Sequence, residues 1–492
     1  MKAVHMKIYI ILMFLSGVLQ LSIFNIDWEY FRMIQAVHIL SSAFVAVVLL
    51  IPYVNRHTYE YMIVKKVNSI SGVMLGLTLF LIILSVFYLF LVGNTGSDKL
   101  GILSYYIHLF GSFVLLFLLF LHIRKRVDSS KASLVAAILM FSVIYPGNAY
   151  SDTAEKLTLI EIEKDLDRYH NEDWTSSAKC KSCHEDIFNQ WADSNHRHLV
   201  GTNPYYMVME NLASEDRGEE FRQWCMGCHN PSAVTTMQTR TTHDMDGNNM
   251  PNILLESGGQ SLVDAFNIHG NSRLEQGVSC ITCHRITKVE SKGNASYTLD
   301  LTNRKKYVFE ESNTEVARWL SEKFINANPK AHKESYSKEI YKESAYCASC
   351  HDEFLPDSKR AVVSTFKEWE KSPYNNPKDK KKHKSCIDCH MTYMKDGKIS
   401  PLKGTSTTGG VLKDDIKVHY FAGANHFLSG LRNKTNEDQT IQLLKTSAEL
   451  DVDMKDGKII VGVKNVGAGH HLPTGASDFR ELWLVVTLKD AD

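Results

Sequence analysis

Every cysteine of this 492-residue chain belongs to a C-x-x-C-H motif, and the motif occurs five times. The two thiols of such a motif can add to the vinyl groups of a haem, and the histidine that follows can bind the iron. In a chain of this composition, chance would give on the order of 0.01 such motifs. The motifs therefore predict five covalent haems c, attached through Cys180 and Cys183, Cys225 and Cys228, Cys280 and Cys283, Cys347 and Cys350, and Cys386 and Cys389, with His184, His229, His284, His351 and His390 as proximal ligands.

Two other uses of paired cysteines fit this pattern less well. Disulfides would not place a histidine after every second cysteine, and zinc sites combine two C-x-x-C units without needing that histidine. Haem c is attached outside the cytoplasm, where thiol chemistry differs from that of the reducing cell interior. Residues beyond about 150 are therefore expected in the periplasm.

The average composition hides a division of the chain. Its 44% hydrophobic content and zero formal net charge are typical of a soluble protein, yet nearly all long apolar runs precede Tyr150. A membrane crossing takes about 20 residues, and four runs approach or exceed that length: 6–24, 33–54, 70–92 and 102–123. A shorter run, 132–145, precedes a small-residue stretch that resembles a signal-peptide cleavage region. It is either a fifth span or a signal-like segment within the chain.

Basic residues indicate the orientation of these spans. Only Arg32 and Lys99 fall on one side of the alternating runs, whereas the other side holds Lys2, Lys7, Arg56, Lys65, Lys66, Arg124, Lys125, Arg126 and Lys131. Cytoplasmic loops carry the excess of lysine and arginine. The pattern predicts a multi-pass protein of the cytoplasmic (inner) membrane with a cytoplasmic N-terminus. Five crossings would then deliver the haem c region to the periplasm.

Histidines within the apolar runs are candidates for iron ligands, because ionisable residues in spans usually mark function. His108 and His122 are 14 positions apart, which returns to within about 40° on a helix and separates them by about 21 Å. His38 matches the depth of His108, and His5 that of His122, so each pair could clamp one haem. The alternative is that these histidines are interfacial or hydrogen-bond to neighbouring helices. His57 is some 100° round the helix from His38 and is predicted to be a loop residue.

Short stretches around these histidines carry a family resemblance: residues 5–7, 15–17, 36–40, 106–108 and 121–123. They resemble the four-helix dihaem cytochrome b subunits of formate dehydrogenases and nickel–iron hydrogenases. The resemblance covers roughly residues 1–126 and leaves out the fifth apolar run. It implies that His38 and His108 hold a periplasmic haem b, that His5 and His122 hold a cytoplasmic one, and that the region exchanges electrons with a membrane quinone.

The second half of the chain is polar, with short helical stretches and many breaks. Residues 449–454 and 458–464 alternate around Asp456-Gly457, which predicts a β-hairpin, and 481–488 is a further β-rich run. We therefore expect an α-helical membrane bundle of four or five transmembrane helices, then a haem-packed, mainly helical and irregular multihaem domain with a small C-terminal β-sheet. The expected divisions are 1–126, 127–150, 151–430 and 431–492. The last, with its exposed sheet edge, is expected to continue beyond this sequence or to be covered by a partner.

Several short sequence segments resemble those of periplasmic multihaem cytochromes related to the tetrahaem electron carrier of ammonia oxidation. They are the first motif with residues 191–196, residues 277–280, 368–374 and 469–475. The resemblance spans about 175–480 and implies His196, His426 and His470 as distal ligands. The segment after the fourth motif departs from the pattern, because it ends in Tyr374 where the first has a histidine. The fourth haem would then take a ligand from elsewhere or keep an open position.

Together these features predict a quinol dehydrogenase acting in anaerobic respiration. It would carry five haems c and two haems b, take electrons from menaquinol in the membrane quinone pool, and pass them to a periplasmic multihaem cytochrome carrier. Its other contact is the lipid bilayer, and no nucleic acid is expected among its partners. The alternative from another class is a terminal reductase of a small nitrogen oxide or similar oxidant, for which Tyr374 is the main support. A haem-based sensor has no output domain in this sequence to support it.

Overall fold

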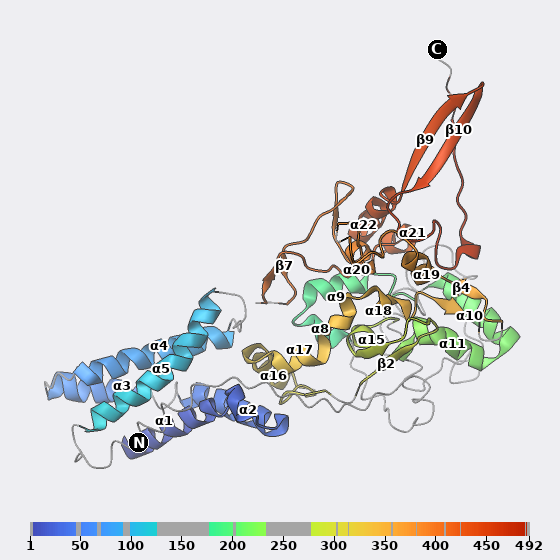
Figure 1. Ribbon diagram of the computed structural model, residues 1–492. Helices are drawn as coiled ribbons and strands as arrows, with labels where there is room; N and C mark the ends of the chain where they lie inside the picture. Colours follow the sequence, from blue (N-terminus) through green and yellow to red (C-terminus); the bar gives the residue numbers. More distant parts are fainter. Residues whose placement is uncertain are drawn as a thin grey trace. The chain divides into compact units, whose positions relative to one another are not determined.

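The computed structural model divides the chain into two compact units, each considered by itself (Figure 1). The first comprises Met1–Thr153, Lys305–Glu334 and Gly409–Leu412, and the second comprises Ala154–Arg304, Ser335–Thr408 and Lys413–Asp492. The structure describes residues 3–45, 51–65, 70–91, 99–124, 177–199, 203–232, 277–301, 304–312, 314–355, 358–379, 381–407, 410–423, 425–487 and 489.

Helices dominate the first unit. They are α1 (Ala3–Val18), α2 (Trp28–Val45), α3 (Ile51–Thr58), α4 (Ile70–Leu91) and α5 (Lys99–Arg124), with a short 3-10 turn at Ser22–Phe24 and a π-helix at Tyr59–Val64 directly after α3. α4 and α5 pack along their lengths. Gly111 permits the close approach, since a Cβ there would lie 3.0 Å from Ile82 Cγ1.

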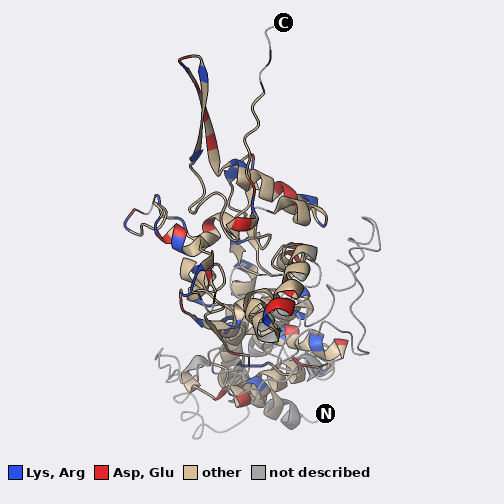
Figure 2. Cartoon of the chain, turned by 90° about the vertical axis from the view of Figure 1, so that its right-hand side faces the viewer, with Lys and Arg blue, Asp and Glu red and all other residues tan. Residues whose placement is uncertain are grey.

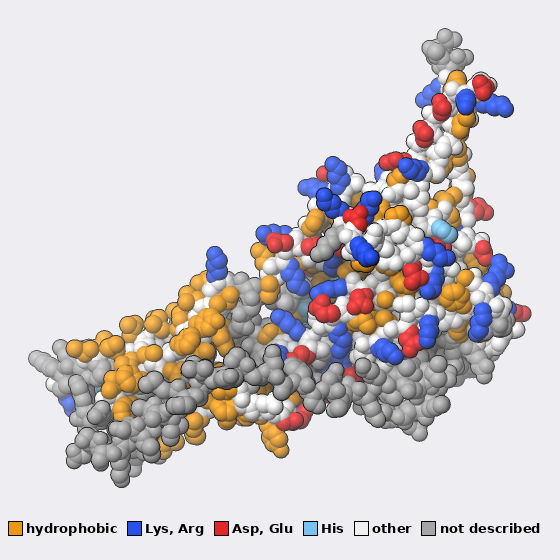
Figure 3. Space-filling view, in the orientation of Figure 1, with side chains coloured by type: hydrophobic (Ala, Val, Ile, Leu, Met, Phe, Trp, Pro, Cys, Tyr) orange, Lys and Arg blue, Asp and Glu red, His pale blue; other side chains and the backbone are white. Residues whose placement is uncertain are grey.

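Two of the described helices are long and apolar enough to cross a membrane, Gly72–Phe90 and Lys99–His122, and Ile8–Val18 is a shorter apolar helix. This is fewer than the four or five spans expected. α2 begins at Trp28 and carries Glu29, Arg32 and Gln35 in its first turns, which lowers its hydropathy. The expected fifth run lies outside the described residues. Hydrophobic side chains gather on the surface of α4 and α5 (Figure 3).

A segment from the haem-binding half of the sequence packs against this first unit. It contains α16 (Glu315–Ala327), which lies beside α2 and α4, and is followed by α17 (Lys330–Tyr336). Trp28 Nε1 donates to Lys306 O at 2.9 Å, and the buried Gln35 Nε2 donates to Phe324 O at 3.0 Å. Residues 305–334 therefore belong to the helical unit, which their polar composition does not indicate.

The second unit is built from short elements around the cysteine motifs. The strands form two-stranded sheets only, in the part of the chain that the structure describes. Its helices are α8 (Ala178–Lys181), α9 (Glu185–Ala192), α10 (Pro204–Arg217), α11 (Glu219–His229), α15 (Cys280–His284), α18 (Ser344–Ala348), α19 (Thr365–Glu370), α20 (Cys386–His390), α21 (His426–Gly430) and α22 (Lys434–Lys445), with 3-10 turns at Glu339–Lys342 and Ser477–Phe479. Its short strands are β1 (Ile286–Val289), β2 (Tyr297–Leu299), β3 (Glu353–Phe354), β4 (Ala361–Val363), β5 (Met394–Lys395), β6 (Lys398–Ile399), β7 (Gly404–Thr405) and β8 (Leu412–Lys413).

The predicted C-terminal hairpin is confirmed. β9 (Ala448–Lys455) and β10 (Lys458–Asn465) pair antiparallel, and the turn residues Asp456 and Gly457 both have positive φ, as a two-residue hairpin turn requires. Charged residues occur along the hairpin, which projects from its unit (Figure 2). The further strand expected at 481–488 is wrong for residues 481–487, which form no strand. A β-rich composition needs a paired neighbour to become a strand, and residue 488 is outside the described part.

A glycine turn ties the segment after the third motif to the segment after the fourth. Gly293 has φ +72°, and an added Cβ would overlap Asp352 O. The next residue, Asn294, donates its backbone N–H to Asp352 O at 3.1 Å, and its side chain bonds both N–H and C=O of Phe354 at 2.7 Å. This turn therefore holds β3 beside the hairpin of β1 and β2.

We predict that Gly293→Ala destabilises the second unit by about 3 kcal/mol, because overlap with Asp352 O adds to the roughly 1 kcal/mol strain of a left-handed alanine. Gly397→Ala is the matched control, since φ is +71° there and nothing lies within 4 Å of an added Cβ. Thermal unfolding of the full-length protein, followed by circular dichroism, compares the two. Equal melting temperatures would contradict the proposed clamp.

Candidate haem-binding site

The local structure of the motifs brings their three functional side chains together. In α15 and α20 the first cysteine opens a one-turn helix and the histidine ends it. Residues i, i+3 and i+4 share one helix face, so both thiols and the imidazole project to the same side. Ser279 and Ser385 cap these helices in reciprocal capping boxes, which fixes where each helix starts.

Three proximal histidines are oriented by backbone carbonyls from distant parts of the sequence. The Nδ1 atoms of His184, His284 and His390 bond Ser406 O (2.6 Å), Tyr336 O (2.7 Å) and Ala422 O (2.5 Å). A carbonyl only accepts, so each Nδ1 carries the hydrogen and leaves Nε2 with the lone pair for a metal. This support is typical of histidines that bind metals.

Pairs of imidazole rings lie at a nearly constant separation in both units. With an Fe–N bond of about 2 Å and about 1 Å from nitrogen to ring centre, two axial imidazoles on one iron have centres about 6 Å apart. The ring planes meet at angles from 13° to 76°, whereas the centres stay 6.1 to 6.3 Å apart. A bound iron would require this distance and would allow the rings to rotate about the Fe–N bonds. The pairs are His38 with His108, His57 with His122, His196 with His351, and His390 with His470.

His196 faces the fourth motif rather than its own. Its ring centre lies 6.1 Å from that of His351. Burial lowers the pKa of His196 to about 3 and that of His351 to about 4, and neighbouring histidines add to both shifts. Both rings are therefore neutral at physiological pH, the form that binds iron. Of the two alternatives left open for the fourth haem, the His196 ring favours a ligand from elsewhere in the chain. Tyr374 Oη donates to Val466 O at 2.9 Å.

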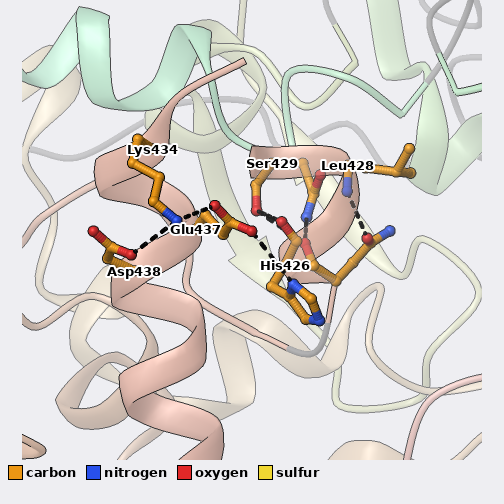
Figure 4. A network of polar contacts seen from close by, with 8 residues as sticks. His426, Leu428, Ser429, Lys434, Glu437 and Asp438 are labelled. Atoms are coloured by element: carbon orange, nitrogen blue, oxygen red, sulfur yellow. Dashed lines mark hydrogen bonds and ion pairs between the residues drawn. The ribbon is translucent and has the colours of Figure 1, made fainter. Parts of the chain in front are cut away.

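His470 lies beside His390, as a distal ligand of the fifth motif would, and its Nδ1 bonds His471 O at 3.0 Å. The third predicted distal ligand, His426, is placed differently. It opens α21, is about half exposed, and its Nδ1 lies 3.8 Å from Glu437 Oε1 (Figure 4). Among the described ring pairs, His426 faces no motif histidine.

Sequence reasoning did not single out His419. Burial lowers its pKa to about 3, and the nearby His284 and His184 contribute. Its Nδ1 bonds Lys417 O at 3.0 Å, which leaves Nε2 for a metal. His419 is thus a candidate distal ligand between the first and third motifs. Nothing in the sequence distinguishes it from the other histidines outside the motifs.

The second motif has different surroundings. The ring of His229 stacks on Tyr206, with centres 4.2 Å apart and planes at 11°. Its buried Nδ1 has no hydrogen-bond partner among the described residues, unlike the carbonyl-bonded proximal histidines. Burial lowers the pKa of His229 to about 4, so this ring too is neutral.

Contacts between cysteines show which motifs are neighbours. No disulfide joins the ten cysteines, and three pairs of thiols from different motifs lie next to each other: Cys180 and Cys280, Cys228 and Cys350, and Cys347 and Cys386. The third and fourth motifs also touch, since Tyr346 Oη donates to Cys283 O at 2.5 Å. The spatial order is therefore first, third, fourth and fifth, with the second motif beside the fourth.

The first and third motifs are joined in the same way as the fourth and fifth. Trp191 Nε1 donates to Val278 O at 2.8 Å, two residues before the third motif. Trp369 Nε1 donates to Lys384 O at 2.9 Å, two residues before the fifth motif. In both cases the tryptophan lies on the helix that follows one motif and bonds the backbone just before the other motif of the pair.

A serine bond repeats as well. Cys280 N donates to Ser177 Oγ and Cys386 N donates to Ser344 Oγ, both at 3.2 Å. Each serine precedes the first cysteine of its own motif by three residues. The two motif pairs are therefore copies of one arrangement, which the uneven motif spacing had concealed.

The position of His196 in the first copy is taken by Tyr374 in the second. Val278 N donates to His196 O at 2.9 Å, and Lys384 N donates to Tyr374 O at 3.2 Å. His196 and Tyr374 each follow the tryptophan of their copy by five residues. The backbone is thus repeated, but only the first copy carries an imidazole at its end.

In the first unit, His38 and His108 have the surroundings of a haem site. Ser16 Oγ donates to Met13 O and lies 2.9 Å from His38 Nδ1, so the hydroxyl accepts from that nitrogen and leaves Nε2 for iron. Gly17 leaves room for the ring, because a Cβ there would lie 3.1 Å from His38 Cε1. His122 pairs with His57 on α3, and its expected pairing with His5 stays a prediction. The His5 side chain is outside the described part.

We predict that His196→Ala converts the haem of the fourth motif from low-spin to high-spin, since it removes the imidazole that faces His351. Tyr374→Phe, which removes only the hydroxyl that bonds Val466 O, should leave the spectrum unchanged. Electron paramagnetic resonance of the oxidised full-length protein, with and without cyanide, makes the comparison. A high-spin, cyanide-sensitive signal already present in the wild type and unchanged by His196→Ala would instead support an open position at the fourth haem.

Comparison with known families finds a match at residues 179–249, described as Cytochrome c554 and c-prime. This segment includes the first two motifs and supports covalent haem c there. No curated protein matches the chain, and no solved structure does. The resemblance of the N-terminal helices to dihaem cytochrome b subunits stays a prediction. Residues 179–249 are a multihaem domain of the cytochrome c554 and c-prime type, and its function is electron transfer.

Proposed function

We propose that this protein is a quinol dehydrogenase of the cytoplasmic membrane, which conducts electrons from menaquinol to a periplasmic multihaem cytochrome carrier. The observation that carries the proposal is that both units present imidazole pairs spaced for one iron: His38 with His108 in the first, and His196 with His351 and His390 with His470 in the second. Bound haem would supply reversible one-electron iron chemistry.

The residues of the first unit support binding of a b-type haem without a covalent link. Ser16 holds the His38 ring in one tautomer, and Gly17 leaves space beside it. His108 projects from α5, one of the two long apolar helices. This pair is therefore the point where electrons from a membrane quinol would enter the protein.

The second unit supports conduction rather than substrate chemistry. Its motifs touch through their cysteines, so groups attached to those cysteines would be close neighbours. Paired imidazoles leave no open coordination position on the iron between them. The protein's contribution is then spacing, ligation and burial, with no bond of a substrate to break beyond quinol oxidation.

An exposed apolar face on α4 supports the membrane location. Leu77, Phe80, Leu84 and Phe87 recur along one side of α4, and each is more than half exposed. A row of large apolar side chains facing outward marks an interaction surface, and on a helix of this length and hydropathy a bilayer is the fitting partner. The distribution of lysine and arginine described above supports a cytoplasmic N-terminus and a periplasmic second unit.

The reductase alternative has lost its main support. It depended on an open position at the fourth haem, opposite Tyr374. His196 lies there instead, 6.1 Å from His351. No specific contact of the described residues favours a reductase over a conductor.

We predict that His108→Ala abolishes reduction of the c haems by a menaquinol analogue but not by dithionite, because the bridge between quinol and the c haems depends on this ligand. Phe110→Ala is the matched control, on the same helix with a side chain more than half exposed. Stopped-flow absorbance at the c-haem α band measures both rates. Reduction of His108→Ala by quinol at the control rate would contradict the proposed entry point.

A further inference from the structure

His57 and His122 form a ring pair that the sequence did not predict. Their centres are 6.3 Å apart and their planes meet at 71°. His38 and His108, the other pair in this unit, are 6.1 Å apart at 76°. The two pairs therefore have nearly the same geometry, although His57 had been assigned to a loop.

The local structure places His57 on a helix and not in a loop. The loop assignment came from counting 100° for each residue along one continuous helix from His38. The structure describes α3 from Ile51 to Thr58, and His57 lies in its last turn, just before the π-helix Tyr59–Val64. A π-helix winds with more residues per turn than an α-helix, so the 100° step does not hold throughout this segment.

The same two parts of the chain supply both pairs. α5 contributes His108 and His122, which lie about 21 Å apart along its axis. The partners His38 and His57 both come from the segment that runs from α2 to α3. The half-buried His57 and His122 thus have the same arrangement as His38 and His108, further along α5.

We infer that His57 and His122 are the axial ligands of the second haem b, and that His5 is not. This rests on the proposed function, because it assumes that the first unit binds haem b. It departs from the arrangement implied by the cytochrome b resemblance, in which His5 would hold this haem. The two haem sites then require α2, α3 and α5 but no ligand from α1.

The test compares His57→Gln with His5→Gln in the full-length protein purified from membranes. Acid–acetone extraction separates haem b from covalent haem c, and the pyridine haemochrome assay gives the ratio of the two. We expect His57→Gln to lose about half of the extractable haem b, or to turn that half high-spin in the resonance spectrum. His5→Gln should keep the wild-type ratio and remain low-spin, and five covalent haems c in each variant show that the chain was assembled.

A His108→Gln variant separates failure of this inference from failure of the proposed function. If His108→Gln loses haem b while His57→Gln keeps all of it low-spin, the inference is wrong and the proposed function stands. Loss of haem b from His5→Gln, with none from His57→Gln, overturns the inference in favour of the family arrangement. Wild-type protein without extractable haem b would overturn both.

Discussion

An imidazole that holds iron through one nitrogen is oriented by the bond that its other nitrogen makes, and three of the five motifs in the second unit have such a bond. The carbonyls that support His184, His284 and His390 come from 222, 52 and 32 residues away in the sequence. A carbonyl in the middle of a helix or a sheet ladder is already bonded. The irregular backbone at Ser406 and Ala422 and the C-terminal end of α17 at Tyr336 leave acceptors for these three proximal rings.

The second unit has a small protein core. The buried apolar side chains of the second unit are scattered among the described residues: one cluster holds Ile281, Ile286, Tyr297 and Leu299, and Met226, Met394 and Val418 are buried outside it. Long-range polar bonds take over part of the task of holding segments together, and the tryptophans at 191 and 369 each bond a carbonyl next to another motif. Bound porphyrins would add apolar surface between these segments.

The sequence predicts what depends on neighbouring residues. The motifs, the hairpin turn at Asp456-Gly457 and the apolar α4 and α5 follow from short patterns, and the structure contains them. The sequence does not reveal which motifs contact one another, because the loops between contacting motifs differ greatly in length. Cys180 and Cys280 are 100 positions apart, whereas Cys347 and Cys386 are 39 apart. His57 was assigned to a loop by counting from His38, whereas it lies on α3. Residues 305–334 carry no pattern that predicts their packing against α2.

The two copies of the motif pair are unequal in one respect. The first copy ends in His196, whose ring lies beside His351 of the fourth motif, in the second copy. The first copy thus supplies a candidate ligand to the second. The second copy ends in Tyr374, which bonds the backbone of its own C-terminal segment. The repeat is therefore directional, like a chain of modules in which each donates to the next and the last is capped. With a tyrosine in place of a histidine, the second copy has no imidazole at this position to offer to a further motif pair.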